Sequence, residues 1–179
     1  MAREGQTPVE KDLEIALCSK IRLGASATRA IQISTPSKMY TLFDLLEDTA
    51  PIILQDHSDW NNHKYLSADL FGGITPDIVL RSPLSGENRI IIEVKNTAPF
   101  GHAELDASQV LRYFLHLLTT TNRKFKAKED MPRAVLLAAP SEWFESTCAI
   151  PWKHFLKQYN PLASQFNILL GGIILDPAA

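Results

Sequence analysis

The sequence predicts an α/β protein, and three of its features indicate this class. Short runs of aliphatic and β-branched residues have the composition of buried strands. Between them lie longer segments in which apolar residues recur at helical spacing. Pro, Gly, Ser and Asn cluster at the boundaries, as expected for turns. The hydrophobic content of 45% and the charged content of 21% are ordinary for a folded globular chain.

The length of 179 residues predicts one domain, residues 1–179, with an insertion at about residues 30–65. The formal net charge of −2 excludes a globally basic nucleic-acid-binding protein, so contacts with nucleic acid would depend on local basic patches. Cys18 and Cys148 lack the spacing of a metal site, and we expect a reduced, cytoplasmic chain. No apolar run is long enough to span a bilayer, so no membrane contact is expected.

The first predicted helix starts at Thr7-Pro8, where Thr7 can cap the helix and Pro8 suits its first position. Apolar residues then recur at helical spacing as far as Gly24, which can end the helix. Glu10 and Glu14 lie one turn apart on this helix. Acids near a helix start are usually caps or solvated charges, and that interpretation stays open for both.

The next part of the chain is predicted to hold a short strand at residues 30–35 and a helix at residues 37–48, whose Met and aromatic side chains belong to the core. A polar loop follows. It contains His57 and His63, but their spacing fits no standard metal motif, so a surface loop is the better interpretation. Asp69, just before the next strand, is a lesser candidate acid.

Residues 75–81 and 89–95 predict two strands, and the turn residues at 82–88 predict that they form a hairpin. Both runs are apolar on both faces, which indicates a buried central hairpin. Because side chains alternate along a strand, Glu93 and Lys95 share one face. Asp77 on the neighbouring strand can lie close to Glu93. Two carboxylates and one lysine therefore emerge at the end of a core strand pair.

Two carboxylates that point at one spot make a hard-oxygen site, which suits Mg²⁺ or Mn²⁺. A lysine beside them can orient water or stabilise charge on a phosphate. The alternative is that Asp77 caps the entry of its strand and that Glu93 and Lys95 form a solvated pair at a strand end. The short pattern alone does not decide between these interpretations.

The segment at residues 103–120 predicts a strong helix with one apolar face. Gln109 and Tyr113 are four residues apart and so meet on one side of it. They can touch a phosphate or a base near the metal, or they can form a hydrogen-bonding pair at the rim of the core.

A basic segment follows this helix at residues 122–128, where cations surround Phe125. It can grip phosphates and stack on a base, although such runs are usually solvated loops. The candidate substrate-binding cations here are Arg123, Lys124 and Lys126.

The C-terminal part of the chain predicts a buried strand at 133–139, a short turn or helix from Ser141, a helix at 151–159 and a closing strand at 167–175. The last strand is expected to bend at Gly171-Gly172.

These motifs together resemble the PD-(D/E)xK nuclease superfamily. Pro76-Asp77 and Glu93-x-Lys95 stand across a hairpin, and Gln109-x-x-x-Tyr113 on the next helix resembles the additional motif of the RecB-type exonuclease branch. The resemblance implies a restriction-endonuclease-like core, with a mixed central sheet flanked by helices in the order αβββαβ. It also implies hydrolysis of phosphodiester bonds in nucleic acid, with DNA favoured, by a nuclease dependent on Mg²⁺ or Mn²⁺.

The resemblance also implies roles for particular residues. Asp77, Glu93 and the Val94 carbonyl would hold the metal, and an acid on the first helix would complete the site, with Glu10 preferred and Glu14 left open. Lys95 would position water or stabilise the transition state, and Gln109 and Tyr113 would orient the substrate. Relatives suggest a homodimer or a larger nuclease complex. The alternatives are a non-catalytic nucleic-acid-binding or assembly protein that keeps the nuclease fold, and a plain α/β domain with a chance motif.

Overall fold

A computed structural model describes residues 8–46, 51–54, 76–97, 105–119 and 132–175. Among these residues, two short helices and three short strands lie between the first helix and the central hairpin, and helices alternate with strands after it. In chain order the elements are α1 (Pro8–Arg22), α2 (Ala25–Ala30), β1 (Gln32–Ser34), β2 (Met39–Thr41), α3 (Leu42–Leu45), β3 (Ile52–Leu54), β4 (Ile78–Arg81), β5 (Asn88–Val94), α5 (Leu105–Thr119), β6 (Arg133–Ala139), α6 (Ser141–Glu145), the 3₁₀ helix η3 (Thr147–Ala149), α7 (Ile150–Gln165) and β7 (Ile168–Ile174).

The described strands form one seven-stranded mixed sheet in the order β2-β1-β7-β6-β5-β4-β3. Strands β5, β6 and β7 run parallel to one another, and the remaining neighbours pair antiparallel. Parallel neighbours need a crossover connection, and α5 and α7 supply these crossovers. Strand β5 is buried along its whole length and lies near the middle of the sheet.

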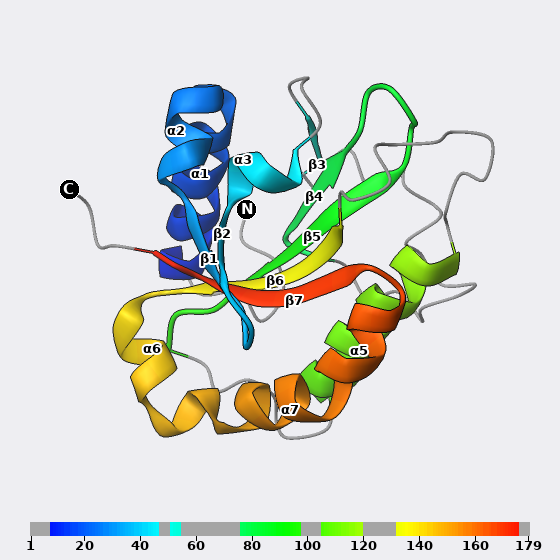
Figure 1. The fold of residues 1–179 in the computed structure, drawn as a ribbon. Coiled ribbons are helices and arrows are strands. Elements are labelled where there is room, and N and C mark those ends of the chain that lie inside the picture. The colour runs from blue at the N-terminus through cyan, green and yellow to red at the C-terminus, as the bar shows by residue number, and fades with distance from the viewer. Residues whose placement is uncertain (1–7, 47–50, 55–75, 98–104, 120–131, 176–179) are drawn as a thin grey trace.

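Helices cover both faces of the sheet, as Figure 1 shows, with α1, α2 and α3 on one side and α5, α6 and α7 on the other. Alternate residues of each central strand point to opposite faces. Ile90 and Ile92 pack in the core on the α1 side, whereas Ile91 packs against α5. Burial on both faces explains why β6 is almost continuously apolar and why β5 contains the apolar run at residues 90–92.

The predicted α/β class with a mixed sheet flanked by helices is therefore confirmed. The predicted hairpin is also confirmed, since β4 and β5 pair antiparallel and a turn joins them at residues 82–87. The long helices and the last two strands lie where the sequence placed them. No helix among the described residues has the length and apolar character needed to cross a membrane.

The prediction of a single helix at residues 37–48 was wrong. The chain there first forms β2 and then the short helix α3, and it turns at Thr41, which caps α3. The Thr41 hydroxyl accepts a hydrogen bond from the Asp44 amide, and Asp44 Oδ2 accepts one from the Thr41 amide. This capping box starts a helix at residue 42, so the preceding residues are left to pair with β1. Helix α2 and strand β3 were not predicted.

The two glycines at which the sequence predicts a bend in the last strand lie at close contacts with other parts of the chain. Gly171 and Gly172 are both within the continuous strand β7. A Cβ atom added at Gly171 would lie 2.8 Å from the Ser34 carbonyl oxygen of β1. A side chain at this position would therefore push β1 away from β7.

Candidate active site

The predicted acid pair lies at one end of the central hairpin. The register of β4 and β5 places Ile78 opposite Ile92. The same antiparallel register, continued by one residue, places Asp77 opposite Glu93. Both carboxylates are buried, with about 7% of each residue exposed. The hairpin therefore brings together the two acids that the sequence singled out.

Asp77 is held by the backbone of the facing strand. Its Oδ2 atom accepts a hydrogen bond of 2.8 Å from the Val94 amide. A backbone amide that donates to a buried carboxylate fixes the orientation of that carboxylate. Asp77 is thus tied to the strand that carries Glu93, which limits the movement of the two acids relative to each other.

Glu93 lies between a lysine and a tyrosine. Lys95 Nζ is 3.5 Å from Glu93 Oε1, and the Tyr113 hydroxyl donates a hydrogen bond of 3.3 Å to Glu93 Oε2. Glu93 and Lys95 share the strand face that packs against α5, as the alternation predicted, and Tyr113 reaches this face from α5. Tyr113 is 2% exposed, so its ring packs in the core while its hydroxyl reaches the acid.

Helix α1 adds two more buried acids. Glu10 is 5% exposed and Glu14 is 7% exposed, so neither is the solvated charge that acids near a helix start usually are. They continue the stripe of buried residues formed by Leu17, Cys18 and Ile21. Glu10 Oε1 accepts a hydrogen bond of 3.2 Å from the Asn96 amide, directly after Lys95. This contact ties the start of α1 to the end of β5.

Cys18 is a buried thiol on the same face of α1 as Glu14. Burial raises the pKa of Cys18 to about 12, and the negative charges of Glu14 and Asp77 act in the same direction, whereas Arg22 opposes them. Both carboxylates therefore lie close enough to act on one thiol. Glu14 and Cys18 are four residues apart on α1, so Asp77 lies beside this part of the helix.

Asp77, Glu93 and Lys95 thus lie at one end of the hairpin, and the contact of Glu10 with the Asn96 amide brings the start of α1, which also carries the buried Glu14, to the same end. Carboxylate oxygens are the ligands that Mg²⁺ and Mn²⁺ prefer, so the chemistry of this set fits those ions. Within the described residues, no three Asp, Glu, His or Cys side chains are placed so that they could hold a metal ion as they stand. The donor chemistry fits a divalent cation, and binding one would require side-chain rotations at the site.

The other predicted site residues differ in how far the structure describes them. The Val94 amide contacts Asp77 and its side chain packs in the core on the α1 side, while the role of its carbonyl oxygen as a metal ligand stays a prediction. Gln109 lies on α5, but its side chain is outside the described residues. The same is true of the whole basic segment with Arg123, Lys124 and Lys126, and of His57, His63 and Asp69.

Two features of the site were missed in the sequence. The first is Cys18, whose sequence signal is its position four residues after Glu14 on the buried stripe of α1. The Asn96 amide, which Glu10 engages, has no sequence signal because its role depends on tertiary packing.

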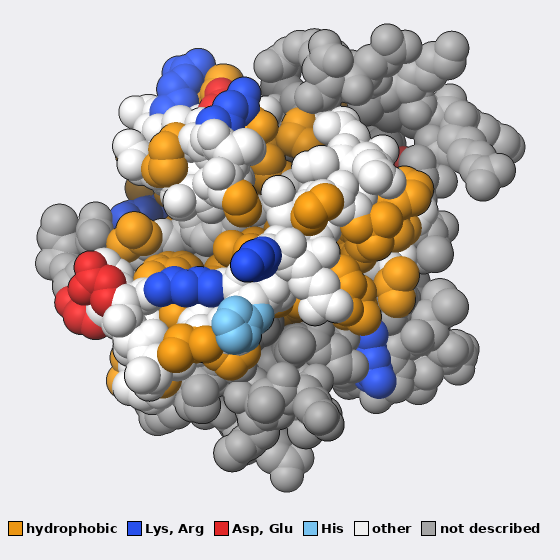
Figure 2. Space-filling view, turned by 60° about the horizontal axis from the view of Figure 1, so that its bottom comes forward, with side chains coloured by type: hydrophobic (Ala, Val, Ile, Leu, Met, Phe, Trp, Pro, Cys, Tyr) orange, Lys and Arg blue, Asp and Glu red, His pale blue; other side chains and the backbone are white. Residues whose placement is uncertain are grey.

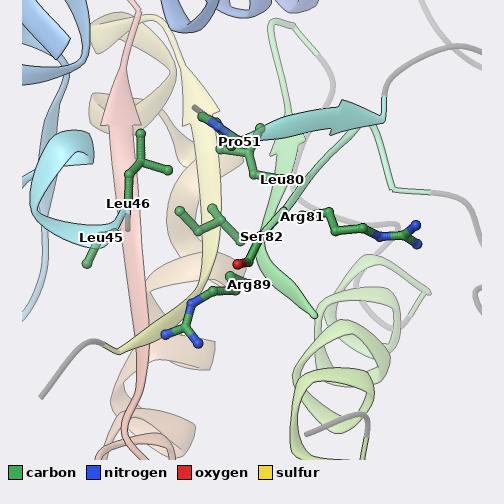
Figure 3. Close-up of a pocket in the computed structure, with 8 residues that line it drawn as sticks. Leu45, Leu46, Pro51, Leu80, Arg81, Ser82 and Arg89 are labelled. Atoms are coloured by element: carbon green, nitrogen blue, oxygen red, sulfur yellow. The ribbon is translucent and has the colours of Figure 1, made fainter. Parts of the chain in front are cut away.

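A small pocket lies at the opposite end of the same hairpin (Figure 3). Leucine side chains from α3 and β4 line it together with Arg81, Ser82 and Arg89. Arg81 and Arg89 extend in opposite directions, so their guanidinium groups do not meet in the pocket (Figure 3). It is therefore separate from the acids at the other end of the hairpin.

Comparison with protein-family models, with curated proteins and with solved structures gives no match to this chain. The site must therefore be interpreted from its own geometry and chemistry.

Proposed function

We propose that the protein is a nuclease that depends on Mg²⁺ or Mn²⁺ and hydrolyses phosphodiester bonds, with DNA as the favoured substrate. The observation that carries the proposal is the burial of Glu10, Glu14, Asp77 and Glu93, each 5–7% exposed, around the end of one hairpin beside Lys95. Buried carboxylates are costly because they lose hydration and repel one another. A bound divalent cation offsets both costs, so the arrangement suits a protein that works with a metal.

The acids divide into two roles under this proposal. Asp77 and Glu93 would hold the cation, since the strand register places them opposite each other. Glu14, buried on α1, is the candidate to complete the set of ligands. Glu10 instead engages the Asn96 amide and would position the chain after Lys95. A carboxylate oxygen has more than one lone pair, so accepting a hydrogen bond does not prevent metal binding.

A divalent cation at these carboxylates would activate water and neutralise charge on the phosphate. Lys95 would assist the reaction beside the cation. Its ammonium group is 3.5 Å from Glu93 Oε1, so it can orient a water molecule near the acids or stabilise the charge of the transition state. Tyr113 holds Glu93 in place through its hydroxyl, which limits the rotamers that the acid can adopt.

The order of the elements supports a restriction-endonuclease-like core. Helix α1 is followed, after the β1–β2 hairpin and two short helices, by the antiparallel strands β3, β4 and β5. Helix α5 then leads to β6, which is parallel to β5. This series contains the order αβββαβ. In this arrangement both motif strands lie inside the sheet, and α5 brings Tyr113 to their end.

Cleavage of end-labelled single-stranded and double-stranded DNA, linear and circular, tests the proposal. We expect cutting with Mg²⁺ or Mn²⁺, none with EDTA, and a loss of at least about 100-fold in the Asp77→Asn and Lys95→Met variants. Glu142→Gln removes an exposed acid on α6 and is the matched control, with activity unchanged. The proposal fails if both site variants cut at the rate of the control.

One observation favours a second candidate, a nucleic-acid-binding protein that does no chemistry. Within the described part of the chain the acids do not form a ready-made metal site, and Lys95 is ion-paired with Glu93. Such a protein would bind DNA equally well with EDTA and with Mg²⁺, and it would cut under neither condition. The same cleavage assay therefore separates the two candidates.

A further inference from the structure

The acidic residues are distributed unevenly along the chain. Residues 15–43 and residues 146–175 contain no Asp or Glu, yet together they hold six Lys and Arg residues. Because the whole chain carries a formal charge of −2, the remainder carries −8. The near-neutral total therefore hides a strong separation of charge, which the net charge alone did not reveal.

The two acid-free stretches are neighbours in the fold. Strand β1 of the first pairs with β7 of the second. The turn between β1 and β2 also lies beside the end of α7, and together they form a polar groove with a volume of about 220 Å³. None of the described residues that line the groove is acidic, and it is lined mainly by hydroxyl and amide side chains together with Lys38 and Tyr40.

Helix α7 connects this groove with the surroundings of the candidate active site. At its start, η3 contacts the chain that follows Lys95, where Cys148 Sγ lies 3.8 Å from the Thr97 carbonyl oxygen. At its end, Asn160 and Ser164 line the groove. The 16 residues of the helix span about 24 Å at 1.5 Å per residue.

A single stripe of polar residues runs along the exposed side of α7. Lys153, Lys157, Asn160 and Ser164 follow one another at spacings of four, three and four residues, so they lie on one side of the helix. Both lysines are exposed, and His154 lies next to Lys153. Figure 2 shows basic side chains and a histidine near the middle of this face, and acidic side chains only at its edge.

We propose that this stripe and the groove bind the phosphate backbone of a nucleic acid and guide it along α7. The identity of the partner depends on the proposed function. The binding surface is inferred from the groove and from Lys38, Lys153 and Lys157, three of the six cations of the acid-free stretches; the other three lie on α1 and α2. Lys153 and Lys157 pair with successive phosphates, and Lys38 with the hydroxyl and amide groups of the groove holds one nucleotide at the far end. A concave polar groove suits a nucleotide better than an acidic lipid surface, which favours a flat amphipathic face.

Binding of a fluorescein-labelled single-stranded DNA oligonucleotide, measured by anisotropy in EDTA, tests this inference without any cleavage. We expect Lys153→Ala/Lys157→Ala to bind at least about fivefold more weakly, with the slope of log affinity against log salt reduced by about 0.7 for each lost phosphate contact. Lys38→Ala should weaken binding in the same direction. Lys20→Ala removes one exposed lysine from α1, on the other face of the sheet, and should bind as the wild type does.

Equal affinities for the α7 variants and Lys20→Ala would overturn the inference. So would binding of the wild type to phosphatidylserine vesicles but not to the oligonucleotide. The proposed function fails separately, through the absence of metal-dependent cutting. If the protein cuts DNA but neither cutting nor binding depends on the α7 lysines, the proposed nuclease function stands and the proposed binding surface is wrong. If binding depends on these lysines but no cutting occurs, the binding surface stands and the nuclease function is wrong.

Discussion

At the scale of single residues, the two acids of the hairpin are each held in position by hydrogen bonds or an ion pair. Glu93 receives the Tyr113 hydroxyl and the Lys95 ammonium group, and Asp77 receives the Val94 amide. Each contact comes from the strand pair itself or from the helix packed against it. Because the partners are parts of the packed core, they restrict the rotamers that the two carboxylates adopt in the absence of a ligand.

His116 gives a prediction at the residue scale. It is fully buried on α5, its Nε2 atom lies 3.2 Å from Asn88 Nδ2, and burial lowers its pKa from 6.5 to about 4. Between these values the unfolded chain binds a proton that the folded protein does not, so this residue's contribution to stability is lost as the pH falls from 6.5 to 4. At 1.36 kcal/mol per pKa unit, the loss is about 3 kcal/mol.

Chemical denaturation at a series of pH values measures this effect as the free energy of unfolding. We expect the free energy of unfolding of His116→Gln to fall less than that of the wild type between pH 6.5 and pH 4, with a difference of about 3 kcal/mol. His154→Gln replaces an exposed histidine on α7 and should follow the wild type. If all three proteins lose stability in parallel, the buried histidine is not the cause.

At the scale of elements, the close contact between β1 and β7 depends on the absence of a side chain at Gly171. A Cβ atom at Gly171 would meet the Ser34 carbonyl oxygen at 2.8 Å, and a backbone atom cannot move without shifting its strand. A Cβ atom at Gly172 would meet the ring of Phe144 at 3.1 Å, and a side chain can rotate aside. A side chain is therefore expected to be less well tolerated at Gly171 than at Gly172.

We predict that Gly171→Ala lowers the free energy of unfolding by about 1–3 kcal/mol, and that Gly172→Ala costs less. Urea denaturation of both variants beside the wild type gives the comparison. Because Ala is also the better strand former, an equal or greater stability for Gly171→Ala would show that β1 does not pack on β7 as described.

The individual helices and strands also show where sequence patterns are enough to predict secondary structure. Strands β5 and β6 could be predicted because burial on both faces gives each of them a run of consecutive apolar residues. Helices α1 and α5 could be predicted because their apolar residues repeat at helical spacing. Strand β3 was missed because three residues at a sheet edge carry too little pattern. The helix predicted at residues 37–48 failed because the pairing of β2 with β1 overrides local preference.

At the scale of the molecule, the site was predictable in part. The acids of the hairpin follow from strand alternation and pairing, which are local rules. The contact of Glu10 with the Asn96 amide joins residues 86 positions apart, and no periodicity reveals it. The charge separation was visible in the sequence, but its meaning required the pairing of β1 with β7, which brings the two acid-free stretches together.

The central claim is that the buried carboxylates form a site for a divalent cation, and a calorimetric titration with Mn²⁺ tests it most directly. We predict that the wild type and Glu142→Gln bind Mn²⁺ alike, and that Asp77→Asn/Glu93→Gln, which keeps the size of both side chains, does not bind it. Circular dichroism of the double variant would verify that it stays folded. Binding that is unchanged in the folded double variant, or no binding by the wild type, would contradict the claim.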